Sequence, residues 1–141
     1  VQVLGKKPDG SLWKVGIQNP IGEDEYLGVL QTSDKAVITS GGYERNFTKN
    51  GKIYHHILDP SNGYPANNGL TSVTIISSDG TLADALSTSL FVMGKDKAID
   101  FYKKSNYNFD FILYSSDNKL IISDGIKDIF SSDLDIKVVN K

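Results

Sequence analysis

The chain has 141 residues, enough for one domain and too few for two independent hydrophobic cores. Its composition, 39% hydrophobic and 23% charged, is that of a globular protein and excludes a disordered one. The formal net charge is −2 and Lys and Arg form no block, so there is no sign of nucleic-acid binding. No stretch approaches the ~18 consecutive apolar residues of a membrane span. Without cysteine, the chain has no disulfide, thiolate nucleophile or Cys-based zinc site.

The first half of the chain has the patterns of β-strands. Trp13, Val15 and Ile17 alternate with Lys, Gly and Gln, which is the period of two of a half-buried strand. A turn signal, Pro8-Asp9-Gly10, precedes this strand, and Asn50-Gly51 favours a hairpin because both residues tolerate positive φ. Further strands are expected at residues 27–32, 36–39, 52–57 and 70–77. A turn is expected at Ser40-Gly41-Gly42.

The second half contains two predicted helices. The first spans residues 82–93, with Thr81 as N-cap, Gly94 as a left-handed C-terminal residue, and apolar or small residues on most sides, which predicts that it is buried. Its apolar stripe consists of Leu82, Leu86, Leu90 and Met93. The second helix, residues 96–104, is amphipathic, with Ala98, Ile99 and Tyr102 facing inward.

A hairpin of residues 109–114 and 119–123, joined through 115–118, follows the helices, and residues 135–139 are a possible closing strand. The predicted class is α+β, with a mixed or antiparallel sheet, one buried helix and one amphipathic helix.

Three segments contain more polar and turn residues than packing requires. The first is Thr39-Ser40-Gly41-Gly42-Tyr43-Glu44-Arg45, where hydroxyls and backbone amides next to glycines can approach a phosphate closely. Taken alone, a simple glycine turn between strands is the more common explanation, because glycine pairs are ordinary turn residues. The second is Tyr54-His55-His56-Ile57-Leu58-Asp59-Pro60, which holds both histidines of the chain. Strand alternation places them on opposite faces, and a strand-end histidine is often structural.

The third segment is Asp79-Gly80-Thr81-Leu82-Ala83-Asp84-Ala85-Leu86-Ser87-Thr88. Asp84 and Thr88 are four residues apart and therefore lie on one helix face, and their oxygen atoms suit a hard cation such as Mg²⁺. The alternative is a capping box, because Thr81 and Asp84 have the spacing of that motif. The spacing alone does not separate the two interpretations.

In order along the chain, these segments resemble the C-terminal half of the ApbE family. The resemblance runs from the first residue to about Gly125 and includes Leu4–Gly10 with Trp13–Pro20, the three polar segments, Gly63-Tyr64-Pro65 and Leu90-Phe91-Val92-Met93-Gly94. One departure is Gly42, where many relatives carry a polar residue. The resemblance implies that the N-terminal half of the same domain is missing from this sequence.

The resemblance implies an FAD:protein FMN transferase, which moves FMN from FAD to a Thr or Ser hydroxyl of a partner flavoprotein, releases AMP and requires Mg²⁺. By the same resemblance, Asp84 and Thr88 are metal ligands together with a residue of the missing half. His56, which directly precedes Ile-Leu-Asp-Pro, is the catalytic candidate. Leu58 contacts the flavin nucleotide through its backbone, and Ser40 and Gly41 contribute to the pocket.

Two other functions are compatible with the same residues. The chain could be an FAD-binding module without transfer activity, or an FAD pyrophosphatase in which water replaces the acceptor hydroxyl. The resemblance further implies a lipoprotein anchored to the extracytoplasmic face of the bacterial membrane through the missing N-terminal part, with a cytoplasmic location as the alternative. The identity of the acceptor protein cannot be read from the sequence.

Overall fold

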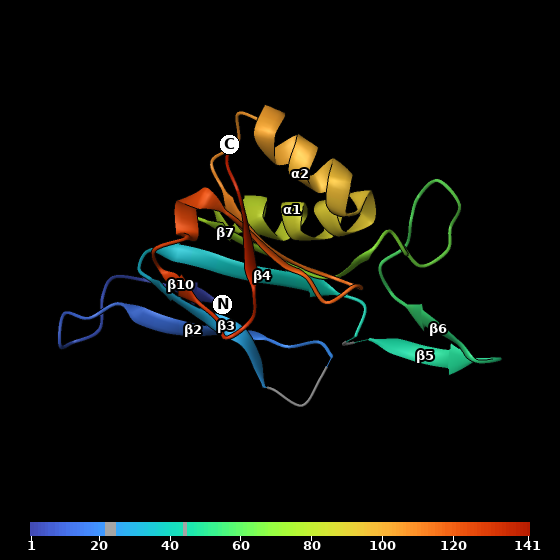
Figure 1. Ribbon diagram of the computed structural model, residues 1–141, viewed down its shortest axis with the longest axis horizontal. Coiled ribbons are helices and arrows are strands. Elements are labelled where there is room, and N and C mark those ends of the chain that lie inside the picture. Colours follow the sequence, from blue (N-terminus) through green and yellow to red (C-terminus); the bar gives the residue numbers. More distant parts are fainter. Residues whose placement is uncertain (22–24, 44) are drawn as a thin grey trace.

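A mixed six-stranded sheet forms the centre of the molecule, in the strand order β1-β4-β7-β8-β9-β11 (Figure 1). The computed structural model describes residues 1–21, 25–43 and 45–141. Neighbouring strands of this sheet are antiparallel except β11, which pairs parallel with β9. The strands are β1 (Gln2–Val3), β4 (Lys35–Gly41), β7 (Leu70–Ser77), β8 (Asp110–Ser115), β9 (Leu120–Ser123) and β11 (Ile136–Val139).

Side-chain alternation along these strands builds two hydrophobic cores, one on each face of the sheet. Helices α1 (Gly80–Met93) and α2 (Lys95–Lys104) cover one face of the sheet (Figure 1). Val73, Ile75 and Phe111 belong to the core on this face. The opposite face packs through Ile76 and Ile112 against a second sheet, of order β10-β3-β2, and the 3₁₀ helix η1. These elements are β2 (Trp13–Gln18), β3 (Tyr26–Thr32), η1 (Asp124–Ile126) and β10 (Phe130–Ser131). The predicted α+β class is confirmed.

A two-stranded hairpin, β5 (Asn46–Lys49) and β6 (Lys52–His55), extends away from these layers at the right of Figure 1. Its turn is the predicted one, since Asn50 and Gly51 have φ of 51° and 73°. The predicted strand 52–57 is two residues too long. After His55 the chain turns so that Ile57 is buried and Leu58 forms only a single bridge with Pro65.

Helix α1 begins earlier than predicted, and Thr81 is not its N-cap. Asp79 is the N-cap, and its carboxylate accepts hydrogen bonds from the backbone N–H groups of Thr81 and Leu82. This correction removes the capping-box interpretation of Asp84, because Thr81 lies inside the helix. At the other end, Gly94 has the expected positive φ of 80° but an extended ψ of 170°.

The helix is also less enclosed than predicted. Its buried residues are Ala83, Leu86, Ser87, Leu90 and Phe91, whereas Met93 is 36% exposed. The face that carries Asp84, Ala85, Thr88 and Ser89 is open. Helix α2 has the predicted amphipathic arrangement, with Ala98 and Tyr102 buried and Ile99 packed against the core. In the described part of the chain, no helix combines the length and the hydropathy that a membrane crossing requires.

Candidate functional site

Strand β4 brings the first polar segment against the open face of helix α1. The strand runs two residues beyond its predicted end, so Ser40 and Gly41 are strand residues, paired with Val73 and Ser72 of β7. The turn predicted at Ser40 therefore begins only after Gly41. Alternation places Ser40 on the helix side of the sheet. Glu44, in the same polar segment, lies outside the described residues.

Three hydroxyl groups and one carbonyl form a connected chain between β4 and α1. The Ser40 Oγ lies 2.8 Å from the Ser87 Oγ and 3.0 Å from the Thr88 Oγ1. The Ser87 hydroxyl in turn donates to the backbone carbonyl of Asp84 at 2.9 Å. The structure thus joins Ser40 to Thr88, two residues that the sequence places 48 positions apart.

Only one arrangement of the three hydroxyl protons makes all three bonds. A carbonyl oxygen cannot donate, so the Ser87 proton points to Asp84; Ser40 must then donate to Ser87, and Thr88 must donate to Ser40. The proton of Thr88 is thereby committed to Ser40. The lone pairs of its Oγ1 are not used in this chain of bonds, and Thr88 itself is exposed.

Asp84 lies one turn before Thr88 on the same exposed face, and no hydrogen bond of its carboxylate to another described residue is found. The donor set of one carboxylate and one hydroxyl, both oxygen, fits Mg²⁺ in chemical type. It does not fill the shell of a metal, because the described residues contain no group of three or more His, Asp or Glu side chains that could hold one. Further ligands must come from substrate, water or another part of the protein.

His56 lies at the exposed end of β6, beside a cavity of ≈380 Å³. Its Nδ1 is 3.4 Å from the backbone carbonyl of Arg45. A carbonyl only accepts, so this contact places the proton on Nδ1 and leaves the Nε2 lone pair free. The cavity is lined by Arg45, Asn46, Phe47, Tyr54, His55 and His56. Within it, the rings of Phe47 and Tyr54 stack at 5.2 Å.

His55 has a different environment from His56. Its ring packs edge-on against Phe91 of α1, with 5.7 Å between ring centroids, and its Nε2 lies 3.0 Å from the carbonyl of Ala66. Nε2 must therefore carry the proton. The unprotonated Nδ1 is buried and has no hydrogen-bond partner among the described residues. The opposite-face prediction for the two histidines agrees with these contacts, since one ring is packed inward and the other is exposed.

The contacts of His55 also join the hairpin to the end of β4. A Cβ added to Gly42 would lie 2.6 Å from the His55 ring, so the glycine permits this close packing. Gly41 is similarly restricted, since its Cβ would lie 2.4 Å from the ring of Tyr43. The ends of β4 and β6 and the middle of α1 thus lie together. Leu58, at the single bridge after β6, is 52% exposed.

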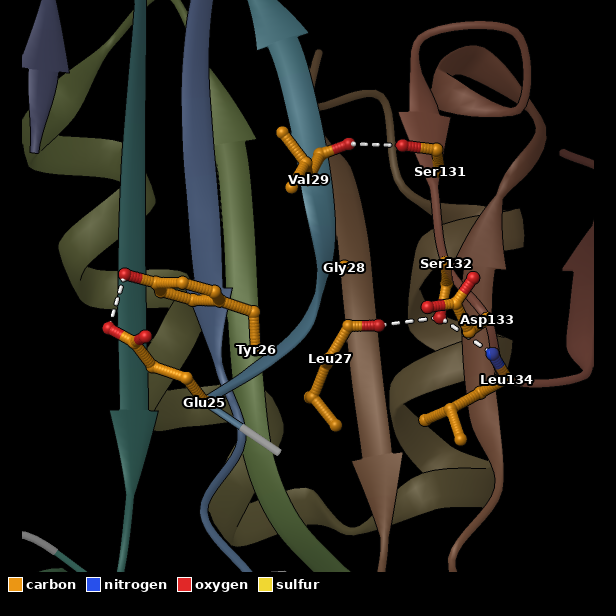
Figure 2. Close-up of a pocket in the computed structure, with 9 residues that line it drawn as sticks. All are labelled: Glu25, Tyr26, Leu27, Gly28, Val29, Ser131, Ser132, Asp133 and Leu134. Atoms are coloured by element: carbon orange, nitrogen blue, oxygen red, sulfur yellow. Dashed lines mark hydrogen bonds between the residues drawn. The ribbon is translucent and has the colours of Figure 1, made fainter. Parts of the chain in front are cut away.

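A second cavity, of ≈400 Å³, lies between β3 and residues 131–134, in the second sheet. Figure 2 shows that the polar groups around it bond to one another. The Ser131 hydroxyl donates to the Val29 carbonyl, and the Ser132 hydroxyl donates to Leu27 and accepts from the Leu134 N–H. These bonds hold β10 and the following loop on β3. None of the predicted site residues lines this cavity.

The sequence-based selection missed Ser87, which is fully buried and connects Ser40 to the helix backbone. One signal could have identified it. Ser87 lies between Leu86 and Leu90 on the inward side of a helix, where a polar side chain needs a hydrogen-bond partner from a neighbouring element.

Comparisons with known proteins identify the family to which the chain is similar. A model of the ApbE family matches residues 1–113. The chain is 33% identical over 123 residues to a FAD:protein FMN transferase of Haemophilus influenzae, covering 86% of this chain and 35% of that protein. The ApbE protein from Thermotoga maritima superimposes with a TM-score of 0.81 at 40% identity, over 91% of this chain and 41% of that one.

A flavin transferase ApbE from Vibrio cholerae superimposes with a TM-score of 0.68 at 28% identity, again over 91% of this chain and 41% of the other. The chain therefore spans about a third to two fifths of the length of the relatives that it matches. The family model covers most of the chain, and the fold superimposes on that of the ApbE protein from Thermotoga maritima: the chain belongs to the ApbE family.

Proposed function

We propose that this chain is the C-terminal part of an Mg²⁺-dependent FAD:protein FMN transferase. The observation that carries the proposal is the hydroxyl chain from Thr88 through Ser40 and Ser87, because Thr88 uses only its proton in this chain and no other described residue bonds to the lone pairs of its Oγ1, one helical turn from Asp84. The names of the relatives support the reaction, since they are FAD:protein FMN transferases and flavin transferases. The N-terminal part of the domain supplies the remaining ligands and pocket walls.

In this proposal, Asp84 and Thr88 bind Mg²⁺ together with the FAD pyrophosphate. When bound, the ion neutralises negative charge on the pyrophosphate and on the AMP that leaves. The backbone of Leu58 and the end of β4 at Ser40 and Gly41 lie next to the nucleotide. At this end of β4, Gly41 packs closely on Tyr43 and Gly42 packs closely on His55. This packing fixes the backbone that would face FAD.

His56 serves as the general base. The acceptor Thr or Ser oxygen attacks the phosphorus of the FMN moiety, a new P–O ester bond forms, and the pyrophosphate P–O bond breaks with release of AMP. The acceptor proton passes to the Nε2 of His56, which the contact of Nδ1 with the Arg45 carbonyl leaves unprotonated. His55 is less suited, because its unprotonated nitrogen is buried.

The decisive experiment incubates the full-length protein with FAD, Mg²⁺ and a Thr-containing acceptor peptide, and measures fluorescent peptide and free AMP. We expect both products in equal amounts, and neither when EDTA is present. AMP and free FMN without labelled peptide would instead show a pyrophosphatase, and FAD binding without AMP would show a binding module.

The location of the protein in the cell is a separate part of this proposal. We propose an extracytoplasmic, membrane-anchored enzyme, and fractionation of cells that carry a tagged full-length protein tests it. Recovery of the tag in the soluble cytoplasmic fraction would contradict this location.

A further inference from the structure

We infer that Ser40 is a positioning residue, which orients the Thr88 hydroxyl so that its lone pairs face the cation. This inference rests on the proposed metal site and deepens it, since it assigns to Ser40 a task other than contact with the flavin. Its basis is the single arrangement of protons that the chain Thr88–Ser40–Ser87–Asp84 permits.

A threonine hydroxyl is a useful cation ligand only when its proton points away from the ion. A free hydroxyl rotates about its C–O bond and spends part of its time with the proton toward the cation site. Ser40 accepts the Thr88 proton at 3.0 Å and therefore favours the productive rotamer. Groups that orient metal ligands in this way typically change metal affinity by about 10–100-fold when removed.

Ser87 makes the acceptor role of Ser40 obligatory. The Ser40 hydroxyl has one proton. It donates this proton in a hydrogen bond to Ser87, because the Ser87 hydroxyl already donates its own proton to the Asp84 carbonyl. Without the Ser87 hydroxyl, the Ser40 proton could point at Thr88 instead, which would reverse the direction of the hydrogen bond between Ser40 and Thr88. Ser87 is fully buried, so it cannot reach a cation on the exposed face with its own side chain.

The chain contains a closely matched control for this inference. Thr39, the neighbour of Ser40 on β4, also forms a hydroxyl–hydroxyl bond across the sheet, to Thr74 at 2.8 Å. Alternation places this bond on the opposite face of the sheet, away from α1. Removal of the Thr39 hydroxyl deletes the same kind of bond in the same strand without touching the proposed site.

The test measures binding of Mn²⁺, a spin-active substitute for Mg²⁺, to the full-length protein by the EPR signal of free Mn²⁺. We expect Ser40→Ala to weaken Mn²⁺ binding about 10–100-fold, and Ser87→Ala to weaken it several-fold. Ser40→Thr, which keeps the oxygen, and the control Thr39→Ala should bind as the wild type does. Thermal unfolding of each variant shows whether it is folded.

Three results would overturn the inference in different ways. Equal Mn²⁺ affinities of Ser40→Ala and Thr39→Ala would remove the positioning role and leave the metal site intact. Weakened binding in Ser40→Ala with unchanged binding in Ser87→Ala would show that Ser40 acts by direct contact. Mn²⁺ binding that is absent in the wild type, or that Asp84→Asn does not weaken, would overturn the proposed metal site and this inference with it.

Discussion

Asp84 and His56 have in common that their functional groups are exposed while a backbone or side-chain neighbour fixes their position. The backbone carbonyl of Asp84 accepts a hydrogen bond from the Ser87 hydroxyl, and the residue itself is exposed on α1. His56 is held by the Arg45 carbonyl at one ring nitrogen. At the scale of single residues, we therefore expect variants of Asp84 and His56 to change the proposed activity more than stability.

For Asp84 the predicted variant is Asp84→Asn. It keeps the shape of the side chain but weakens a hard-cation ligand, so we expect loss of Mg²⁺-dependent turnover in the full-length enzyme. Because Asp79 and not Asp84 caps the helix, the melting temperature should change little. Turnover assays and thermal unfolding check both halves of this prediction. Normal turnover would return Asp84 to a structural or solvent-exposed role.

We expect alanine variants of the two histidines to have different defects, one in catalysis and one in stability. His56→Ala should still bind FAD but transfer FMN about 10²–10⁴-fold more slowly, because it removes the proton acceptor and little binding surface. His55→Ala should reduce stability by about 1–3 kcal/mol, because it removes packing on Phe91 and the bond to Ala66. Single-turnover kinetics and urea unfolding separate the two effects. A larger kinetic defect in His55→Ala would show that the base was assigned to the wrong ring.

At the scale of elements, the start of α1 decides how the proposed metal ligands are presented. The helix begins at Gly80 because the Asp79 carboxylate accepts the N–H groups of Thr81 and Leu82, at 2.9 and 3.0 Å. An acidic N-cap also interacts favourably with the helix dipole. This cap fixes the first turn, and thereby places Asp84 in the second turn on the open face.

Replacement of the cap tests this arrangement. Asp79→Ala should lower the free energy of unfolding by about 0.5–2 kcal/mol, the usual effect of losing an N-cap side chain. Thr81→Ala should have a much smaller effect, because the Thr81 side chain has no capping role and alanine favours the helix. Urea unfolding of the two variants gives the comparison. Equal losses, or a larger loss for Thr81→Ala, would contradict the cap seen in the structure.

At the scale of the whole molecule, the C-terminal elements complete the helix-side core around Tyr102. Tyr102 is 3% exposed, and its hydroxyl donates to Asp124 at 3.1 Å. Burial, followed by the bond to Asp124 and the charge of Asp110, raises the pKa of Tyr102 from 10.0 to about 12. The ammonium group of Lys141 also faces this ring, 5.1 Å from its centroid.

The raised pKa predicts a loss of stability at high pH. Between pH 10 and 12 the unfolded tyrosine loses its proton while the folded one keeps it, so the free energy of unfolding falls as the pH rises through this window. The free energy of unfolding of Tyr102→Phe should fall less over the same window, by about 2 kcal/mol. Urea unfolding of both proteins at pH 9.5 and 11.5 measures the difference. Parallel losses would mean that Tyr102 does not carry this dependence.

The last prediction concerns residues 1–141 as a separate protein. With a core on each face of its central sheet, it should unfold cooperatively. It should not transfer FMN, because Asp84 and Thr88 offer two oxygens against the six ligands of an octahedral Mg²⁺ shell. Calorimetry with FAD and Mg²⁺ should give weak or undetectable binding. Tight Mg²⁺-dependent binding would show that the site is complete within this chain.

The sequence determined the elements whose patterns are local. Period-two alternation predicted β2, and strands were also expected at β3 and β7. The Asn50-Gly51 turn predicted the β5–β6 connection, and the spacing of Asp84 and Thr88 put them on one helix face. The ordered motifs also indicated the family, which the comparisons confirm. Errors of one or a few residues arose where long-range contacts set the boundary, as at the end of β4, which pairing with β7 extends to Gly41.

Only the tertiary structure decided how these pieces meet. No local pattern indicates that Ser40 bonds to Thr88, because hydrogen bonds between a strand and a helix 48 residues away depend on how the sheet and the helix pack. The same holds for the N-cap, where Asp79 and Thr81 both have suitable side chains and the structure has the Asp79 carboxylate as the acceptor of the first N–H groups of α1. The different environments of His55 and His56 also depend on the tertiary structure, because Phe91, Gly42 and Ala66 lie around the ring of His55.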